Sequence, residues 1–346
     1  RRKWIFNPEE RMKALTILIP VYNTEKYIKR CLDSLIVSEI MDDIEILVVN
    51  DGGKDHSVEI IQKYVDSYPE TVRLIDKENG GHGSTINAGI KEAKGKYFRV
   101  LDSDDWFNST DFVKFVNRLK SEDADLVVCD YRKEHTYNSK SEYFVYKNLE
   151  DRKCYCFDDI DLKILEGEYF VMATSTYKTE ILRTSGLKML EKTFYVDMQY
   201  NVVPMTKVET FTYYHLDIYR YFIGRDDQSV NEKVMIKRID QQIRVNKLMA
   251  DAFHNCQFDS KHLKKYMLSY LDIITTVSSI MLVRAGTQEA LDKKKEMLEY
   301  IREQDLWLYH KLRYSILGRA ANLPGRGGRK MFVAAYKVCQ KFYGFN

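Results

Sequence analysis

Three carboxylates stand almost side by side in the segment YFRVLDSDDW, residues 97–106. Asp102, Asp104 and Asp105 directly follow a hydrophobic run. Carboxylates at this spacing repel one another unless a positive charge lies among them. A divalent cation is the obvious candidate, because hard cations take carboxylate oxygens as ligands. Taken alone, the same residues could equally be solvated loop carboxylates, and we expect Asp105 to cap the next helix.

Two further segments place polar residues or glycines after hydrophobic runs. Asp51 ends the run ILVVND, and a turn is the common meaning of such an Asp before Gly52 and Gly53. The segment GGHGSTINAG, residues 80–89, does not fit the G-x-G-x-x-G dinucleotide fingerprint. We interpret it as a loop whose backbone approaches a ligand and then caps a helix.

Hydrophobic strand patterns alternate with helical ones over the first 132 residues. The expected strands are 14–22, 43–51, 71–79, 96–102 and 124–132, and the expected helices are 24–36 (with Thr24 as N-cap), 54–68 and 109–121. Short connections between them predict an α/β fold with a doubly wound, mainly parallel sheet. Ligands of such sheets bind beyond the carboxyl ends of the strands, where Asp51, residues 79–84 and Asp102 to Asp105 lie.

The pattern changes after residue 131. Residues 135–148 alternate like an antiparallel hairpin, 193–208 predict a short helix, and 209–224 predict an aromatic strand. From Val230 onward the periodicity is helical. We therefore divide the chain into a polar leader (1–13), an α/β domain (14–224) and a helical C-terminal domain (225–346).

Composition restricts the class of protein. The 346 residues are 45% hydrophobic, which is typical of a globular chain and excludes a disordered one. The six cysteines lack the spacing of zinc or redox sites, so we expect reduced thiols in a cytoplasmic protein. No stretch reaches 18 uncharged apolar residues, and the leader lacks the apolar region of a signal peptide.

Charge is unevenly distributed along the chain. Residues 306–346 hold eight Lys or Arg and no Asp or Glu, which leaves 46 basic and 51 acidic residues elsewhere. A basic tail on an acidic body predicts an anionic partner for the tail. Nucleic acid is not expected, because basic residues gather only in the tail and no recognition motif is present.

Four motifs occur in a fixed order: TILIPVYN, EILVVNDGG, ENGGHGSTINAG and YFRVLDSDDW. Together they resemble the GT-A nucleotide-sugar glycosyltransferases, specifically the bacterial family 2 inverting enzymes. The later segments FYVDMQYNVVP and YRYFIGRDDQSVN look like further elements of that family. The resemblance covers residues 14 to 231 and leaves out the C-terminal third.

The resemblance implies a UDP-sugar donor and a Mn²⁺ or Mg²⁺ ion. Asp104 would contact the metal, and Asp102 the metal or the ribose. Asp51 would accept a hydrogen bond from uracil. The other residues that the resemblance assigns to the donor are Pro20, Val21, Tyr22, Gly81, His82, Asn87, Ser103, Arg225 and Gln228.

The resemblance also implies a catalytic base. The family carries an acidic pair whose Asp deprotonates the acceptor hydroxyl, and here the pair reads Val196-Asp197. Asp197 is the predicted base, with a helix N-cap as the alternative; the missing Glu leaves open how its loop is held. His215 could complete a metal shell, but its aromatic strand favours a structural role.

The resemblance defines the acceptor less closely than the donor. The implied acceptor is a glycan, a lipid-linked sugar or a polymer in bacterial cell-surface polysaccharide synthesis. Residues 328–346 predict a basic amphipathic helix that either rests on the inner face of an anionic membrane or docks on the protein itself. Oligomerisation is left open. The alternative functions are a sugar nucleotidyltransferase, whose glycine-rich basic loop is missing after the first strand, and a non-catalytic nucleotide-binding module.

Overall fold

The chain divides into two compact units. The computed structural model describes residues 12–135, 140–161, 165, 168–223 and 232–343. One unit, here called the α/β unit, comprises residues 1–154, 172–184 and 210–223, and the other, the helical unit, comprises 155–171, 185–209 and 224–346. Residues 155–171 and 185–209 precede the predicted boundary at residue 224 but group with the helices that follow it.

The α/β unit is built on a sheet with the spatial order β3-β2-β1-β4-β9-β6-β10-β5, with β7 beside β6. Its strands are β1 (Leu15–Val21), β2 (Ile44–Asp51), β3 (Val72–Lys77), β4 (Tyr97–Val100), β5 (Trp106–Phe107), β6 (Leu126–His135), β7 (Lys140–Phe144), β9 (Ser175–Lys178) and β10 (Thr210–Ile223). A short strand, β8 (Cys154–Cys156), occupies the stretch where the chain passes from one unit to the other.

Strand directions confirm the predicted mainly parallel sheet. β1 pairs in parallel with both β2 and β4, β2 with β3, and β6 with β10. β9 runs antiparallel between β4 and β6. β7 pairs antiparallel with β6, so the hairpin predicted within 135–148 takes its first arm from the strand that precedes this segment. Every residue of β2 is buried, as expected for a parallel strand covered on both faces.

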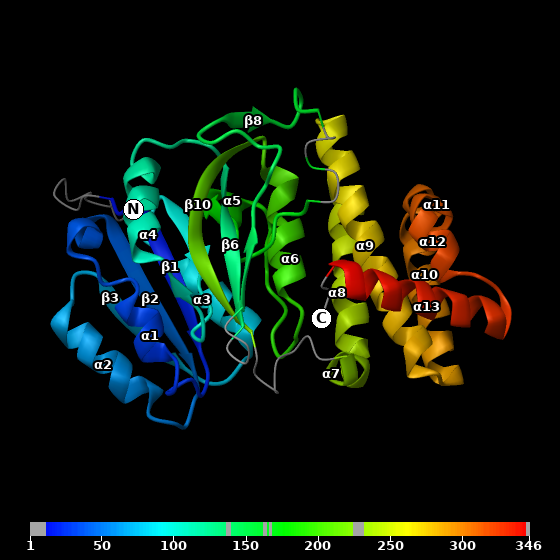
Figure 1. Ribbon diagram of the computed structural model, residues 1–346, viewed down its shortest axis with the longest axis horizontal. Helices are drawn as coiled ribbons and strands as arrows, with labels where there is room; N and C mark the ends of the chain where they lie inside the picture. The colour runs from blue at the N-terminus through cyan, green and yellow to red at the C-terminus, as the bar shows by residue number, and fades with distance from the viewer. Residues whose placement is uncertain (1–11, 136–139, 162–164, 166–167, 224–231, 344–346) are drawn as a thin grey trace, which may run out of the picture. The chain divides into compact units, whose positions relative to one another are not determined.

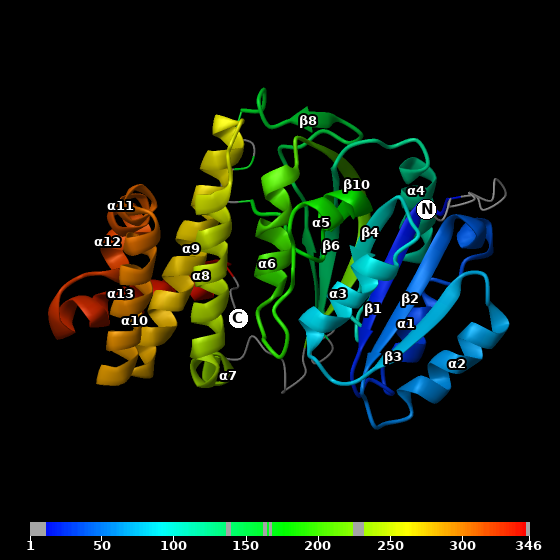
Figure 2. The same ribbon diagram turned by 180° about the vertical axis from the view of Figure 1, so that it is seen from behind.

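Helices cover both faces of this sheet (Figures 1 and 2). A core cluster joins one face to α1 (Ile28–Asp33), α2 (Ser57–Ser67), α4 (Ser109–Leu119) and the 3₁₀ turn η1 (Ser38–Asp43). α3 (His82–Glu92) packs on the other face, where a Cβ on its Gly89 would lie 2.6 Å from Leu18 Cδ1, and α5 (Thr179–Thr184) lies beside α3. Side chains alternate between the two faces along a strand, so a single strand can pack against helices on both faces of the sheet.

The predicted cap of the first helix is wrong. α1 begins at Ile28, and its N-cap is Tyr27, without a side-chain cap bond. The backbone carbonyl of Thr24 accepts hydrogen bonds from the N–H groups of Tyr27 and Ile28 instead. A tight turn thus precedes the helix and uses the Thr24 backbone rather than its hydroxyl.

The helical unit contains most of the remaining helices. They are α6 (Asp197–Val202), η3 (Pro204–Lys207), α7 (Glu232–Lys237), α8 (Ile239–Asn255), α9 (Lys261–Ala285), α10 (Gln288–Gln304), α11 (Leu306–Tyr314), α12 (Ile316–Ala321) and α13 (Gly325–Tyr343). α9 is long and apolar enough to cross a bilayer, although no span was expected, but 67% of its most apolar window is buried inside the protein. That burial is typical of a core helix.

Candidate functional site

The carboxyl ends of β1, β2 and β4 bring the predicted donor residues to one edge of the α/β unit. Val21 pairs with Asn50, the residue before Asp51. The backbone N–H of Leu101 donates to the carbonyl of Leu18, so β1 and β4 are in register up to the start of the carboxylate loop. Tyr22 directly follows β1 and is 54% exposed, with its ring at the surface of this edge.

Asp51 ties the end of β2 to the loop after β3. Its Oδ1 accepts hydrogen bonds from Gly80 N at 2.9 Å and Lys77 Nζ at 2.7 Å, and its Oδ2 accepts one from Gly81 N at 2.7 Å. Ser84 Oγ lies 3.2 Å from the same Oδ1. The turn at Gly52 and Gly53 is satisfied by Asn50, whose Oδ1 accepts from Gly53 N. Asp51 therefore shapes the glycine loop, and its Oδ2 keeps acceptor capacity for one more donor.

The electrostatics of Asp51 favour its ionised form. Burial opposes ionisation, but the hydrogen bonds from Gly80, Lys77 and Gly81 outweigh it, so the pKa of Asp51 lies below its ordinary value. Asp51 is therefore ionised beneath the glycine loop at neutral pH and is paired there with the Lys77 ammonium group.

Asp105 is not the helix cap that its position predicts. The N-cap of α4 is Asn108, whose side chain accepts from Thr110 N. Asp105 is fully buried, and its carboxylate accepts from Tyr219 Oη at 2.6 Å and from Phe222 N at 2.8 Å. Burial raises the pKa of Asp105 well above its ordinary value, and the charges of Asp104 and Asp102 raise it further.

Arg30 supports the same loop from helix α1. Its guanidinium donates to the Asp104 backbone carbonyl at 2.7 Å and lies 3.8 Å from the ring centroid of Trp106. The same group lies 4.8 Å from the centroid of Phe222. A cation held between two rings and bonded to a backbone carbonyl of the loop fixes the position of that loop.

The residues around Asp102 fit a hard cation. Asp102 and Asp104 are both half-buried, and oxygen ligands suit Mg²⁺ and Mn²⁺. His82 Nε2 lies 3.6 Å from Asp102 Oδ1 and is a buried nitrogen without a hydrogen-bond partner. Within the described ranges no group of three His, Cys, Asp or Glu could hold a metal. Such an ion would therefore take its other ligands from a bound phosphate and water, as Mg²⁺ commonly does.

The remaining predicted donor residues divide into those the structure describes and those it does not. Ser103 is buried within the carboxylate loop, Gly81 precedes α3 with φ 84°, and Asn87 is half-buried in α3. Pro20 is the residue before the last of β1 and is half-buried. Arg225 and Gln228 lie outside the described residues.

Asp197 belongs to the helical unit. It is the first residue of α6, while Val196 is the N-cap and makes no side-chain cap bond, so Asp197 does not serve as the N-cap. Asp197 is exposed, and Tyr195 two residues before it has a left-handed φ of 64°. A bulky residue in that conformation is uncommon and is held only by surrounding contacts.

Two glutamines hold the loop before Asp197. Gln199 is buried; its Oε1 accepts from Leu190 N at 3.0 Å and its Nε2 donates to the Lys188 carbonyl at 2.6 Å. Gln241 on α8 accepts from Phe194 N at 2.8 Å. These contacts supply anchoring for a loop that lacks the family's first acidic residue.

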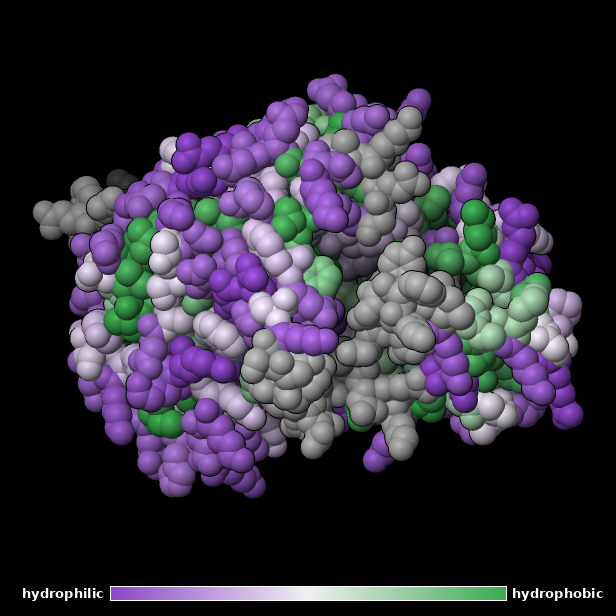
Figure 3. Space-filling model, viewed as in Figure 1, coloured by the Kyte–Doolittle hydropathy of each residue, from purple (hydrophilic) through white to green (hydrophobic). Residues whose placement is uncertain are grey.

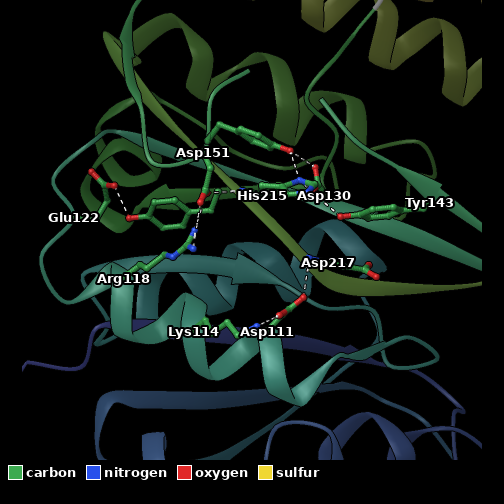
Figure 4. Close-up of polar contacts among 11 residues, drawn as sticks. Asp111, Lys114, Arg118, Glu122, Asp130, Tyr143, Asp151, His215 and Asp217 are labelled. Atoms are coloured by element: carbon green, nitrogen blue, oxygen red, sulfur yellow. Dashed lines mark hydrogen bonds and ion pairs between the residues drawn. The ribbon is translucent and has the colours of Figure 1, made fainter. Parts of the chain in front are cut away.

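His215 lies within a polar cluster of β6, β7 and β10 (Figure 4). Its Nδ1 is 2.7 Å from Oδ2 of buried Asp130, which also accepts from Tyr143 Oη at 2.9 Å and Tyr213 Oη at 2.7 Å. The pairing of β6 with β10 shifts register between Tyr214 and Asp217, and this irregularity contains His215. Burial raises the pKa of Asp130, against the opposing effect of these hydrogen bonds. The contacts give His215 a structural partner.

Part of the sequence matches a known family. Residues 16–183 match glycosyl transferase family 2. That match covers just under half of the chain. The chain is 39% identical over 128 residues to EpsH of Bacillus subtilis, which is 37% of this chain and 36% of EpsH. It is also 42% identical over 96 residues to the chondroitin synthase of Pasteurella multocida, 28% of this chain and 10% of that one. The matches therefore span about a third of EpsH and a tenth of the synthase.

Solved structures confirm the predicted GT-A fold class. Residues 1–349 of Staphylococcus aureus TarS, in complex with UDP-GlcNAc, superimpose with a TM-score of 0.70 at 17% identity over 94% of this chain and 92% of that one. The mannosyltransferase PcManGT from Pyrobaculum calidifontis, in complex with GDP-Man and Mn²⁺, gives 0.52 at 14% identity over 100% of this chain and 92% of that one. At these identities the likeness concerns the fold.

Sequence reasoning missed the residues that support the site. Arg30, Lys77 and Tyr219 contact Asp104, Asp51 and Asp105 from other elements of the α/β unit. The distances in sequence are 74, 26 and 114 residues. No local pattern in a single sequence marks such partners. The sequence hints at them only through the carboxylates themselves, which follow hydrophobic runs and need partners there.

Proposed function

We propose that the protein is an inverting, metal-dependent glycosyltransferase that moves a sugar from a UDP-sugar to a glycan, lipid-linked or polymer acceptor in bacterial cell-surface polysaccharide synthesis. The observation that carries the proposal is the convergence of Asp51, the glycine loop and the carboxylate loop at one sheet edge, where His82 Nε2 lies 3.6 Å from Asp102 Oδ1 and makes no hydrogen bond. The match to glycosyl transferase family 2 supports the reaction class. The complex of TarS with UDP-GlcNAc supports a uridine nucleotide as the donor's leaving part.

The nucleotide half of the donor would lie along β1 and β2. Asp51 Oδ2 retains capacity to accept one N–H, which suits the uracil ring. The exposed ring of Tyr22 offers a stacking surface, while Pro20 and Val21 line the strand end. Gly81, His82 and Asn87 present the first turns of α3 toward the diphosphate, where a helix N-terminus favours negative charge.

The diphosphate would be bound at the carboxylate loop. Asp104 and Asp102 would hold a Mn²⁺ or Mg²⁺ ion, with Ser103 shaping the loop between them and His82 beside it. The ion would neutralise the charge that develops on the leaving diphosphate. Arg225 and Gln228 are assigned to the donor by family resemblance alone.

Transfer requires a base for the acceptor hydroxyl. Asp197 is exposed at the start of α6 and would accept that proton while the acceptor oxygen attacks the anomeric carbon. The new C–O bond forms as the bond from the anomeric carbon to the phosphate oxygen breaks, and UDP leaves with the electron pair. Attack from the face opposite the leaving group inverts the configuration.

The first test measures nucleotide binding. Thermal unfolding of the wild type is compared with UDP, GDP, CDP and dTDP, each with and without Mn²⁺, because a ligand of the native state raises its apparent stability. We expect a shift with UDP that depends on Mn²⁺ and is lost in Asp104→Asn. Asp66→Asn is the matched control, since Asp66 is an exposed carboxylate on α2 that accepts a hydrogen bond from neutral Gln62.

The second test separates catalysis from binding. Asp197→Asn should bind UDP and Mn²⁺ as the wild type does, but lose transfer and donor hydrolysis. If no nucleotide stabilises the protein, the donor site is refuted. If UDP binds but no sugar nucleotide is ever consumed, a binding module replaces the enzyme.

A further inference from the structure

Helix α11 exposes an apolar stripe. Leu306, Trp307 and Tyr314 are 56%, 45% and 56% exposed, and they lie on the side of the helix opposite its buried residues Leu308 and Leu312. A free monomer surface normally carries such large side chains singly. Here they share one helical face with exposed His310, whose ring stacks on that of Tyr314.

The stripe continues onto α12 at a rigid corner. Ser315 caps α12 by accepting from Gly318 N at 2.8 Å, and its hydroxyl donates to Asp272 at 2.8 Å. The next two residues, Ile316 and Leu317, are 85% and 38% exposed. The corner thus holds two further aliphatic side chains in solvent. Figure 3 shows apolar surface over the C-terminal helices, bordered by hydrophilic side chains.

Cations flank the stripe. On α11, Lys311 and Arg313 project on either side of it, with Lys311 Nζ 5.4 Å from the Trp307 ring centroid and the Arg313 guanidinium 5.4 Å from that of Tyr314. Arg319 follows on α12. Residues 306–346 contain no acidic side chain, and Asp305 before them is engaged as the cap of α11 through Leu308 N. Apolar and aromatic side chains between cations match the chemistry of an anionic bilayer surface.

Three apolar side chains of α13 do not belong to this surface. Phe332 is buried, and Val333 and Tyr336 pack with it against residues of α9 in one core cluster. Over the described side chains of α13, the helix therefore docks on the protein itself, which was the alternative reading of residues 328–346.

We propose that the exposed stripe of α11 and α12, made of Leu306, Trp307, Tyr314, Ile316 and Leu317, is a docking surface for an anionic lipid bilayer. Lys311, Arg313 and Arg319 supply the attraction to lipid headgroups. The apolar side chains enter the boundary between headgroups and acyl chains. The proposal concerns the helical unit and is independent of the donor and of the reaction.

Vesicle sedimentation of the full chain tests the surface. We expect binding to vesicles that contain phosphatidylglycerol, little binding to phosphatidylcholine vesicles, and weakening as salt rises. Ile316→Glu should lower the partition coefficient at least tenfold, because it removes an aliphatic side chain that would enter the bilayer and adds a negative charge. Lys311→Glu should lower it at least fivefold, since each cation near an anionic surface contributes a factor of about five.

A matched variant and an oligomer measurement make the result decisive. Lys295→Glu makes the same charge change at an exposed position of α10, outside the stripe, and should leave vesicle binding unchanged. Equal binding to both vesicle types, no binding, or equal losses in Lys295→Glu and Lys311→Glu would each overturn the proposal. Sedimentation velocity in which Ile316→Glu converts an oligomer into a monomer would also overturn it, because a second copy would then cover the stripe.

Discussion

The hydroxyl of Tyr219 joins the two ends of the carboxylate loop. It accepts a hydrogen bond from Asp102 N at 3.3 Å and donates one to Asp105 Oδ2 at 2.6 Å. Tyr219 and Asp105 are both buried. Strand β10 therefore fixes the loop on which Asp102 and Asp104 stand, although Tyr219 itself is not among the predicted ligands.

Tyr219→Phe should weaken the metal-dependent binding of UDP. The change leaves the Asp105 carboxylate with one donor fewer and frees the Asp102 backbone N–H, so we expect a stability loss of about 1–3 kcal/mol. Titration of Mn²⁺ in the presence of UDP should show an apparent Kd raised by about tenfold, because the two carboxylates lose their fixed separation.

Tyr213→Phe is the control for that prediction. Tyr213 also donates to a buried carboxylate of the same sheet, Asp130, at 2.7 Å. Its loss should lower the unfolding free energy similarly while leaving the affinity for Mn²⁺ and UDP unchanged. Equal affinity losses in both variants would show a general loss of stability rather than a positioning role for Tyr219.

The charge state of Asp105 should leave a signature in the pH dependence of stability. Because burial raises its pKa in the folded state, Asp105 binds its proton more tightly when folded than when unfolded. Its contribution is fully present below the unfolded pKa of about 3.9 and is lost as pH rises through the folded pKa. The stability of the wild type relative to Asp105→Asn should therefore fall from about pH 4 upward, as measured by urea unfolding. A difference that stays level with pH would contradict the raised pKa.

Asp51 should show the opposite slope. Its pKa is lowered in the folded state, so its contribution is present above the unfolded pKa and lost as pH falls through the folded pKa. We expect Asp51→Asn to cost about 1–3 kcal/mol near neutral pH, with a difference from wild type that is constant above about pH 5 and shrinks below about pH 4. Urea unfolding over that range measures it, with Asp66→Asn as a variant expected to stay near wild type throughout. A growing difference at low pH would refute the assignment.

Local sequence patterns predicted the strands of the α/β unit and their parallel pairing, but not the contacts between residues far apart in the chain. The strands that end at Val21 and Asp51 follow from mainly hydrophobic runs, and the strand that ends at Lys77 follows from the shorter pattern VRLI. Their parallel pairing follows from the helices between them. The role of Asp105 did not follow, because the residue after an Asp-Ser-Asp run looks like a helix cap. Its true partners, Tyr219 and Phe222, lie 114 and 117 residues away and are brought to it only by the pairing of β10 with β5.

Gln199→Leu should slow transfer without weakening donor binding. The side chain of Gln199 satisfies Leu190 N and the Lys188 carbonyl, so an isosteric apolar replacement leaves both without that partner and loosens the loop that leads to Asp197. We expect kcat to fall at least tenfold, because a base displaced by a fraction of an ångström transfers protons poorly. The thermal shift with UDP and Mn²⁺ should be retained relative to the variant's own baseline. Gln62→Leu, at an exposed position of α2, should leave both quantities unchanged. A kcat equal to wild type in Gln199→Leu would mean that the loop is held without Gln199, and that Gln241, whose Oε1 accepts from Phe194 N, is sufficient to anchor it.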